Sequence, residues 1–163
     1  MDESGGLSVP IIVMRLLVAA IIGGLIGYER RLHHKAIGIS GMMMVAVGSA
    51  TYMLLAKHLA ETDPSSLSRT LQGLLQGIGF LGGAVIFKGG TDVRGIKTAA
   101  AIWITGAIGL AIGTWLWLLG VTVGIATALI LFIADLPGVR RREAEVEDES
   151  SEQSQAPAKA QER

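Results

Sequence analysis

Glycine is unusually dense in the apolar stretch from Gln72 to Trp103, which limits what this chain can fold into. The segment QGLLQGIGFLGGAVIF is followed by a short charged loop, KGGTDVRGIK, and then by a second small-residue segment, TAAAIWITGAIG. Each glycine in a water-soluble helix costs about 1 kcal/mol relative to alanine. A bilayer enforces helix formation, and glycine then lets two backbones approach closely. The stretch therefore predicts a multi-span membrane protein packed on small residues.

The distribution of charge supports this prediction better than the overall composition does. The chain has 163 residues, of which 50% are hydrophobic, with 22 glycines, no cysteine and a formal net charge of zero. Nearly all charges lie between the apolar runs or in the last two dozen residues. We expect a transmembrane domain over residues 1–138 and a basic, then acidic, disordered cytoplasmic tail over residues 139–163.

Five apolar segments approach the roughly 20 residues that a helix needs to cross a bilayer. The first three are residues 9–28, 42–56 and 71–87. The last run, residues 98–134, would be about 55 Å long as one helix, so it must fold back. Gly113 and Thr114, followed by two tryptophans, mark the turn. The predicted fold class is all-α, a polytopic bundle of about five transmembrane helices.

The basic residues predict the orientation of these spans. With five crossings, one side carries nine cations and the other only two, Lys57 and Arg69. By the positive-inside rule, the N-terminus lies outside and the C-terminus in the cytoplasm.

The third segment has a polar stripe when it is drawn as a helix. Gln72, Gln76, Gly79 and Gly83 share one face at about 100° per residue. We assign the opposite face to lipid: Leu71, Leu74, Leu75, Ile78, Leu81, Val85 and Ile86. The glutamines either form interhelical hydrogen bonds or line a polar path together with Thr105. Five G-x-x-x-G spacings also predict close packing and a homo-oligomer.

Few ionisable residues lie within the predicted spans. Arg15 lies about two turns into the first, where it either snorkels outward or has a function. No carboxylate lies at mid-membrane, which argues against magnesium transport by this chain alone. A charged cluster is predicted at the cytoplasmic edge, forming either a salt-bridge clamp with lipid-headgroup contacts or a docking or gating site. Its members are Glu29, Arg30, Asp92, Arg94 and Lys97.

Three motifs occur in a fixed order: GLIGYERRLHHKAIGI, GFLGGAVIFKGG and VRGIKTAAAIW. In this respect the chain resembles the MgtC/SapB family of bacterial inner-membrane proteins, over roughly residues 10–136. The resemblance implies an N-out, five-span domain, here in a short form without the soluble C-terminal domain of many relatives. The family pattern falls on Glu29, Arg30, Gly79, Phe80, Gly82, Arg94, Gly95, Thr98, Ala99, Ala100 and Trp103. Gly83 and Ala84 stand where many relatives have Ala-Gly.

The resemblance implies a role in adaptation to low magnesium, survival in host cells and regulation of membrane ATPases or membrane potential. No nucleophile elbow, phosphate-binding loop or metalloprotease motif occurs in the sequence. We therefore expect a non-enzymatic regulator or accessory protein with no cofactor, no metal site and no nucleic-acid partner. Its expected partners are the bilayer, another inner-membrane protein and further copies of itself. The alternative is an ion or small-solute transporter or channel subunit that uses the Gln72, Gln76 and Thr105 faces.

Overall fold

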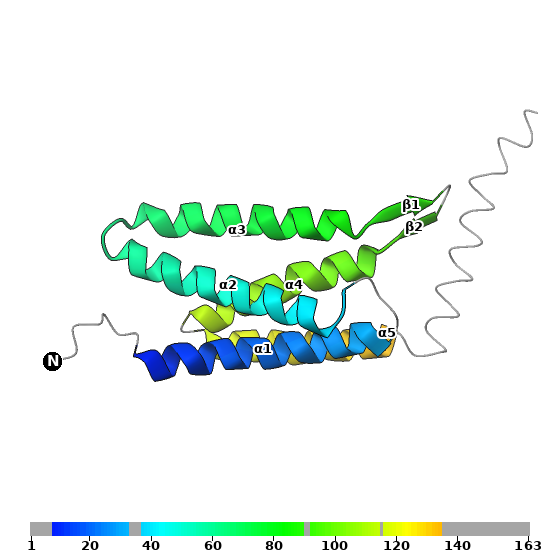
Figure 1. The fold of residues 1–163 in the computed structure, drawn as a ribbon, viewed down its shortest axis with the longest axis horizontal. Helices are drawn as coiled ribbons and strands as arrows, with labels where there is room; N and C mark the ends of the chain where they lie inside the picture. Colours follow the sequence, from blue (N-terminus) through cyan, green and yellow to red (C-terminus); the bar gives the residue numbers. More distant parts are fainter. Residues whose placement is uncertain (1–7, 33–36, 90–91, 115, 135–163) are drawn as a thin grey trace, which may run out of the picture.

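The computed structural model describes residues 8–32, 37–89, 92–114 and 116–134, and within them the chain forms a helical bundle (Figure 1). The predicted tail, residues 139–163, lies outside this part of the chain. Five helices and one short hairpin follow each other in sequence. They are α1 (Val9–Leu32), α2 (Ile39–Ala60), α3 (Ser65–Ala84), β1 (Phe87–Gly89), β2 (Asp92–Arg94), α4 (Ile96–Gly113) and α5 (Trp117–Ala134). The all-α architecture predicted from the sequence is confirmed.

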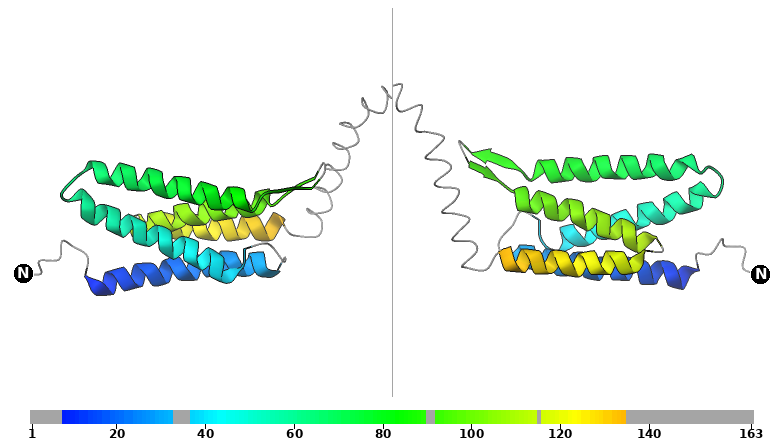
Figure 2. Two further views of the ribbon diagram at one scale, coloured as in Figure 1. Left: turned by 45° about the horizontal axis from the view of Figure 1, so that its top comes forward. Right: turned by 180° about the vertical axis from the view of Figure 1, so that it is seen from behind.

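Successive helices run antiparallel, so that every connection lies at one end of the bundle or the other (Figures 1 and 2). Helices α2 and α4 form the centre: α2 contacts α1, α3 and α4, and α4 contacts all four other helices. Among the described helices, α3 packs mainly against α2 and α4, and it forms one edge of the bundle. The core is apolar, with these members fully buried: Ala19, Ile26, Met42, Ala46, Ala50, Ile102 and Ile112.

Four of the described helices are long and apolar enough to cross a membrane: α1, α2, α4 and α5. Helix α3 has 20 residues, a sufficient length, but its serines, threonine, arginine and glutamines lower its hydropathy. The five predicted helices are therefore present, while the fifth crossing, by α3, stays a prediction. The predicted turn is confirmed, since α4 ends at Gly113 and α5 begins at Trp117.

Glycines of α1 and α4 lie directly against the backbone of α2. A Cβ atom at Gly23 would lie 2.6 Å from the carbonyl oxygen of Met42, and one at Gly109 would overlap that of Ala46. Nothing larger than hydrogen fits at either position without moving the helices apart. The two central contacts of the bundle therefore depend on the absence of a side chain at these sites.

The glycine stripe of α3 has a different environment from the one predicted. A Cβ atom at Gly79 or Gly83 would have no neighbour within 4 Å among the described residues, and Gln72 and Gln76 are exposed. The face that meets the bundle carries Ile78 and Gly82, which the structure buries, together with the partly buried Leu74. The helical-wheel prediction for α3 is thus wrong within one chain for Leu74 and Ile78, which pack on the bundle, because apolar contacts rather than the amides select the packed face. Other residues assigned to lipid are exposed as predicted: Leu75, Leu81 and Ile86.

Candidate functional site

The last turn of α1 holds a buried ion pair between neighbouring residues. The Arg30 Nε donates to Glu29 Oε2 at 2.5 Å, and Arg30 Nη2 donates to Glu29 Oε1 at 2.8 Å. Arg30 is fully buried, and Glu29 is only 8% exposed. Consecutive residues on a helix do not normally face each other, so both side chains bend toward a common point. The bidentate geometry is the strongest form of an arginine–carboxylate contact.

The other members of the predicted charged cluster lie at the same end of the bundle, where β2 and α4 begin (Figure 1). Arg94 and Lys97 are exposed, in contrast to the buried Glu29–Arg30 pair. The side chain of Asp92 lies outside the described part of the structure. Within the predicted cluster, the structure shows Glu29 paired with Arg30. This end of the bundle therefore presents a neutralised buried pair together with exposed cations.

The family-motif residues build the connection between α3 and α4. Gly95 adopts a left-handed conformation with φ of 95°, and a Cβ atom there would overlap the carbonyl oxygen of Val85. One turn into the two helices, a Cβ atom at Gly82 would be in ordinary contact, 3.5 Å, with the carbonyl oxygen of Ala99. These two contacts bring the end of α3 onto the start of α4.

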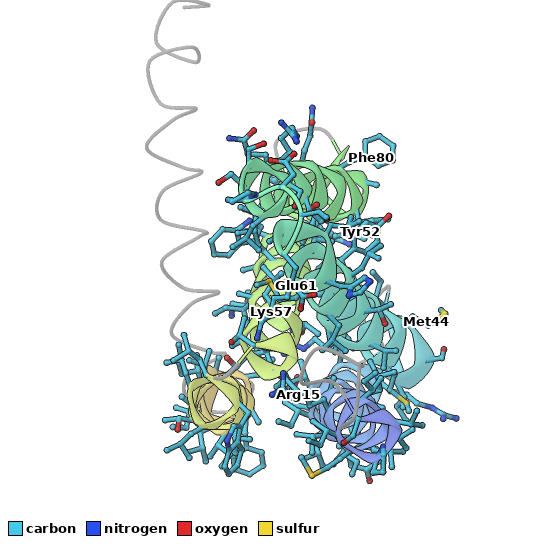
Figure 3. All side chains as sticks on the ribbon, turned by 90° about the vertical axis from the view of Figure 1, so that its left-hand side faces the viewer. Arg15, Met44, Tyr52, Lys57, Glu61 and Phe80 are labelled. Atoms are coloured by element: carbon cyan, nitrogen blue, oxygen red, sulfur yellow. The ribbon has the colours of Figure 1, made fainter. Side chains whose placement is uncertain are left out.

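The remaining motif positions divide into buried and exposed residues. Thr98 is buried, whereas Ala100 and Trp103 are exposed on α4. Phe80 is 78% exposed and points away from the bundle (Figure 3). In a membrane such aromatic side chains contact lipid or a second protein. Two of the motif's large side chains thus lie on the outer surface of the bundle.

The three residues of the predicted polar path are not brought together. Thr105 is fully buried between α4 and α2, where its hydroxyl donates to Ala101 O at 2.7 Å and approaches Met42 Sδ at 3.7 Å. Gln72 and Gln76 lie exposed on α3. Within the described part of one chain the three side chains therefore do not share a lining, and the polar path stays a prediction.

Arg15 is buried inside the opposite end of the bundle rather than extended outward. Its Nη1 donates to the carbonyl oxygen of Gly113 at 2.8 Å, and the side chain is 7% exposed in total (Figure 3). Gly113 is the last residue of α4, where backbone carbonyls lack partners within the helix. Arg15 thus caps α4 from α1. The one sequence signal for this contact was the presence of a cation, Arg15, within an apolar segment.

Two apolar grooves lie between neighbouring helices. One groove, of about 540 Å³, lies between α2 and α3, and its lining includes Gly48, Gly73 and Gly77. The other, of about 330 Å³, separates α4 from α5 and contains Lys97. Both are within or near the size range of small-molecule sites, roughly 300–1,000 Å³. Neither groove was predicted, because each depends on how two helices are spaced.

Comparison with known proteins finds a family match over the part of the chain that contains Glu29, Arg30, Gly82 and Gly95. The sequence profile of the MgtC family matches residues 16–136. The chain belongs to the MgtC family. The match includes α2 to α5 and most of α1, so it covers most of the bundle.

Individual relatives match a similar share of this chain and different shares of their own length. Protein MgtC of Brucella abortus is 40% identical over 116 residues, which are 71% of this chain and 46% of that protein. Protein SrpB of Synechococcus elongatus is 39% identical over 130 residues, 72% of this chain and 71% of that protein. An Escherichia coli protein named "Putative magnesium transporter YhiD" is 34% identical over 125 residues, 73% and 58% respectively.

The chain spans about half the length of the first of these relatives. No solved structure matches it.

Proposed function

We propose that this MgtC-family chain is a non-enzymatic regulatory or accessory protein of the bacterial inner membrane. It acts in adaptation to low magnesium or to membrane-energy stress, through contact with another inner-membrane protein such as a membrane ATPase. Membership of the MgtC family supports the membrane location, and the name of the Escherichia coli relative refers to magnesium.

The observation that carries the proposal is the internal use of buried charge. Among the described residues, the buried charged side chains are Arg15, Glu29 and Arg30. Glu29 and Arg30 bind each other, and Arg15 binds the end of α4. Carriers of hard cations use carboxylate oxygens as ligands at mid-membrane, and Glu29 instead neutralises an arginine near a helix end. These charges stabilise the bundle, which suits a protein that acts through its surface.

The proposed orientation has the N-terminus outside and the C-terminus in the cytoplasm. It is supported by the cations at one end of the bundle: Arg30, Arg31, Arg94 and Lys97. The antiparallel arrangement of α2, α3 and α4 supports a fifth crossing by α3. Reporter fusions near residue 35 should give cytoplasmic activity, and fusions near residue 62 external activity. The same activity at both sites would reject the five-span orientation.

One observation favours the alternative, an ion or small-solute transporter or channel subunit. Gln72 and Gln76 are exposed on α3 beside Gly79 and Gly83, which leave open space. Amide groups in hydrocarbon require hydrogen-bond partners, and a second copy of α3 would supply them. In this alternative the path runs between copies of the chain and excludes the buried Thr105.

Purified protein in liposomes distinguishes the two functions. The regulatory proposal expects no movement of Mg²⁺ or protons above that of empty liposomes. Flux that disappears in Gln76→Leu, with Thr122→Val as a control on the outer face of α5, would instead support the transporter. In cells, deletion of the gene should lower growth at limiting magnesium and change membrane potential and ATP. Unchanged potential, ATP and growth would contradict the regulatory role.

A further inference from the structure

The groove between α4 and α5 has two chemically different parts. Its length is lined by Ala100 and Ile104 of α4 and by Thr127, Ile130 and Ala134 of α5. Its end at the start of α4 contains Lys97, which is the one charged residue among those that line the groove. The described helices thus form an apolar trough that ends in a cation.

The trough offers an apolar guest little hydrogen bonding along its length. Thr127 is the one hydroxyl-bearing residue among the lining residues, and its Oγ1 donates to Val123 O of its own helix at 2.8 Å. The small side chains of Ala100 and Ala134 leave the groove open. Ile130, which is 62% exposed, forms its outer wall. Such a lining fits a hydrocarbon chain better than a polar solute, which would lose its hydration without replacement.

The cation lies where the headgroup of a membrane lipid would be. Lys97 is the second residue of α4, and Arg94, three residues earlier, is also exposed. This is the end of the bundle at which α1 terminates with Arg30 and Arg31. An ammonium group has three donors, so Lys97 can bind a phosphate oxygen together with a contact inside the protein. Basic pockets between transmembrane helices are suited to anionic headgroups.

We propose that the groove between α4 and α5 binds an anionic phospholipid. One acyl chain lies along the Ala100, Ile104 and Ile130 surface, and the phosphate contacts Lys97. The argument rests on the match between an apolar trough with a terminal cation and an amphiphile with a terminal anion. The site is independent of whether the protein is a regulator or a transporter, because it needs only the membrane insertion of α4 and α5.

Native mass spectrometry of the full chain in detergent tests the proposal. The probes are dioleoyl-phosphatidylglycerol and dioleoyl-phosphatidylcholine, which share acyl chains and differ in net charge. The charge variant is Lys97→Gln, with Arg31→Gln as the matched control at the same end of the bundle. The groove variant is Ala100→Trp, with Ala84→Trp as the matched control on the exposed surface of α3.

We expect one phosphatidylglycerol to bind at least fivefold more tightly than phosphatidylcholine. Lys97→Gln should weaken phosphatidylglycerol binding by about fivefold, which corresponds to about 1 kcal/mol for one cation near a membrane surface. Ala100→Trp should remove the binding of both lipids, while the two controls bind as the parent chain does.

Three results would overturn the proposal: equal binding of the two lipids, equal losses in Lys97→Gln and Arg31→Gln, or undiminished binding in Ala100→Trp. The size-exclusion profile establishes that each variant is folded. If Ala100→Trp does not fold, Ala100→Leu partly fills the same groove and should weaken binding of both lipids.

Discussion

Arg15 donates a hydrogen bond to the carbonyl oxygen of Gly113, 98 residues away in sequence, and so joins the start of α1 to the end of α4. The contact places a positive charge at the negative end of the α4 dipole, which is the favourable arrangement. The free-energy cost of burying Arg15 in an apolar helix is thereby offset, because the arginine supplies a hydrogen bond to an unpaired carbonyl group at the end of α4.

Removal of this contact should destabilise the bundle. We expect Arg15→Met to lower the free energy of unfolding by about 1.5–3 kcal/mol, the usual contribution of a hydrogen bond to a charged group. Thermal unfolding in detergent measures the change, with Arg31→Met as a control because Arg31 is exposed on the same helix. Equal effects of the two substitutions would show that the Gly113 contact contributes nothing specific.

Glycines in different environments should differ in their tolerance of a methyl group. Gly109→Ala should cost about 1–3 kcal/mol, because the new Cβ overlaps the backbone of α2 at Ala46. Gly83→Ala should be neutral or stabilise α3 by up to about 1 kcal/mol, since the site is open and alanine favours helix. Unfolding of both variants in the same detergent provides the comparison. A larger loss at Gly83 would indicate that a second chain covers α3.

The positions of the helices were predictable because membrane spans require long apolar runs and the run after Thr98 is too long for one crossing. The turn at Gly113 follows from that length argument. The packed face of α3 was not predictable from the amide stripe. Small and apolar residues occur on several faces of α3, and the choice among them depends on its neighbours α2 and α4. The antiparallel pairing of β1 with β2 was not predicted, because this segment reads as a short charged loop in the sequence.

The candidate site was predictable in part. Glu29 and Arg30 were both predicted to belong to one charged cluster that could form a salt-bridge clamp. The depth of burial of that pair was not predictable, since the sequence places both residues at a helix end, where exposure to water is expected. The groove at Lys97 could not be predicted either, because it arises from the separation of α4 and α5.

The Glu29–Arg30 pair should be important for stability independently of any function. We expect Glu29→Gln to cost about 3–5 kcal/mol, because it removes the negative partner of a fully buried arginine. A double-mutant cycle with Arg30→Gln measures the coupling, which should be favourable. Additive losses would mean that each side chain acts through other contacts.

Asp63, in the turn between α2 and α3, should make the start of α3 sensitive to acid. Its Oδ1 accepts hydrogen bonds from the Ser65 hydroxyl at 2.7 Å and the Ser65 backbone N–H at 2.9 Å, and its Oδ2 accepts one from Arg69. These contacts, led by the Ser65 hydroxyl, lower the pKa of Asp63 below its ordinary value of 3.8. Because the folded pKa is depressed, the stabilisation is complete above about pH 4 and is lost as the pH falls through the folded value.

Nuclear magnetic resonance of the protein in micelles measures this titration. We expect the Asp63 carboxyl to titrate below 3.8 and the Ser65 amide to exchange faster with solvent at the acid end. In Asp63→Asn the acid dependence of Ser65 exchange should disappear. A carboxyl that titrates at its ordinary value would contradict the observed network.

Gly95 should be the least replaceable residue of the connection between α3 and α4. Its φ of 95° lies in the left-handed region, and a side chain there would overlap the carbonyl oxygen of Val85. Gly95→Ala combines strain of roughly 1–2 kcal/mol in the backbone with that steric conflict. We expect it to separate the end of α3 from the start of α4 and to lower the thermal unfolding temperature. Gly73→Ala, in open space on α3, is the matched control. A crosslinking experiment tests the same contact. With cysteines introduced at Gly82 and Ala99, a disulfide should form readily when residue 95 is glycine and poorly in Gly95→Ala. Equal crosslinking in both would show that the left-handed glycine does not position α3 on α4.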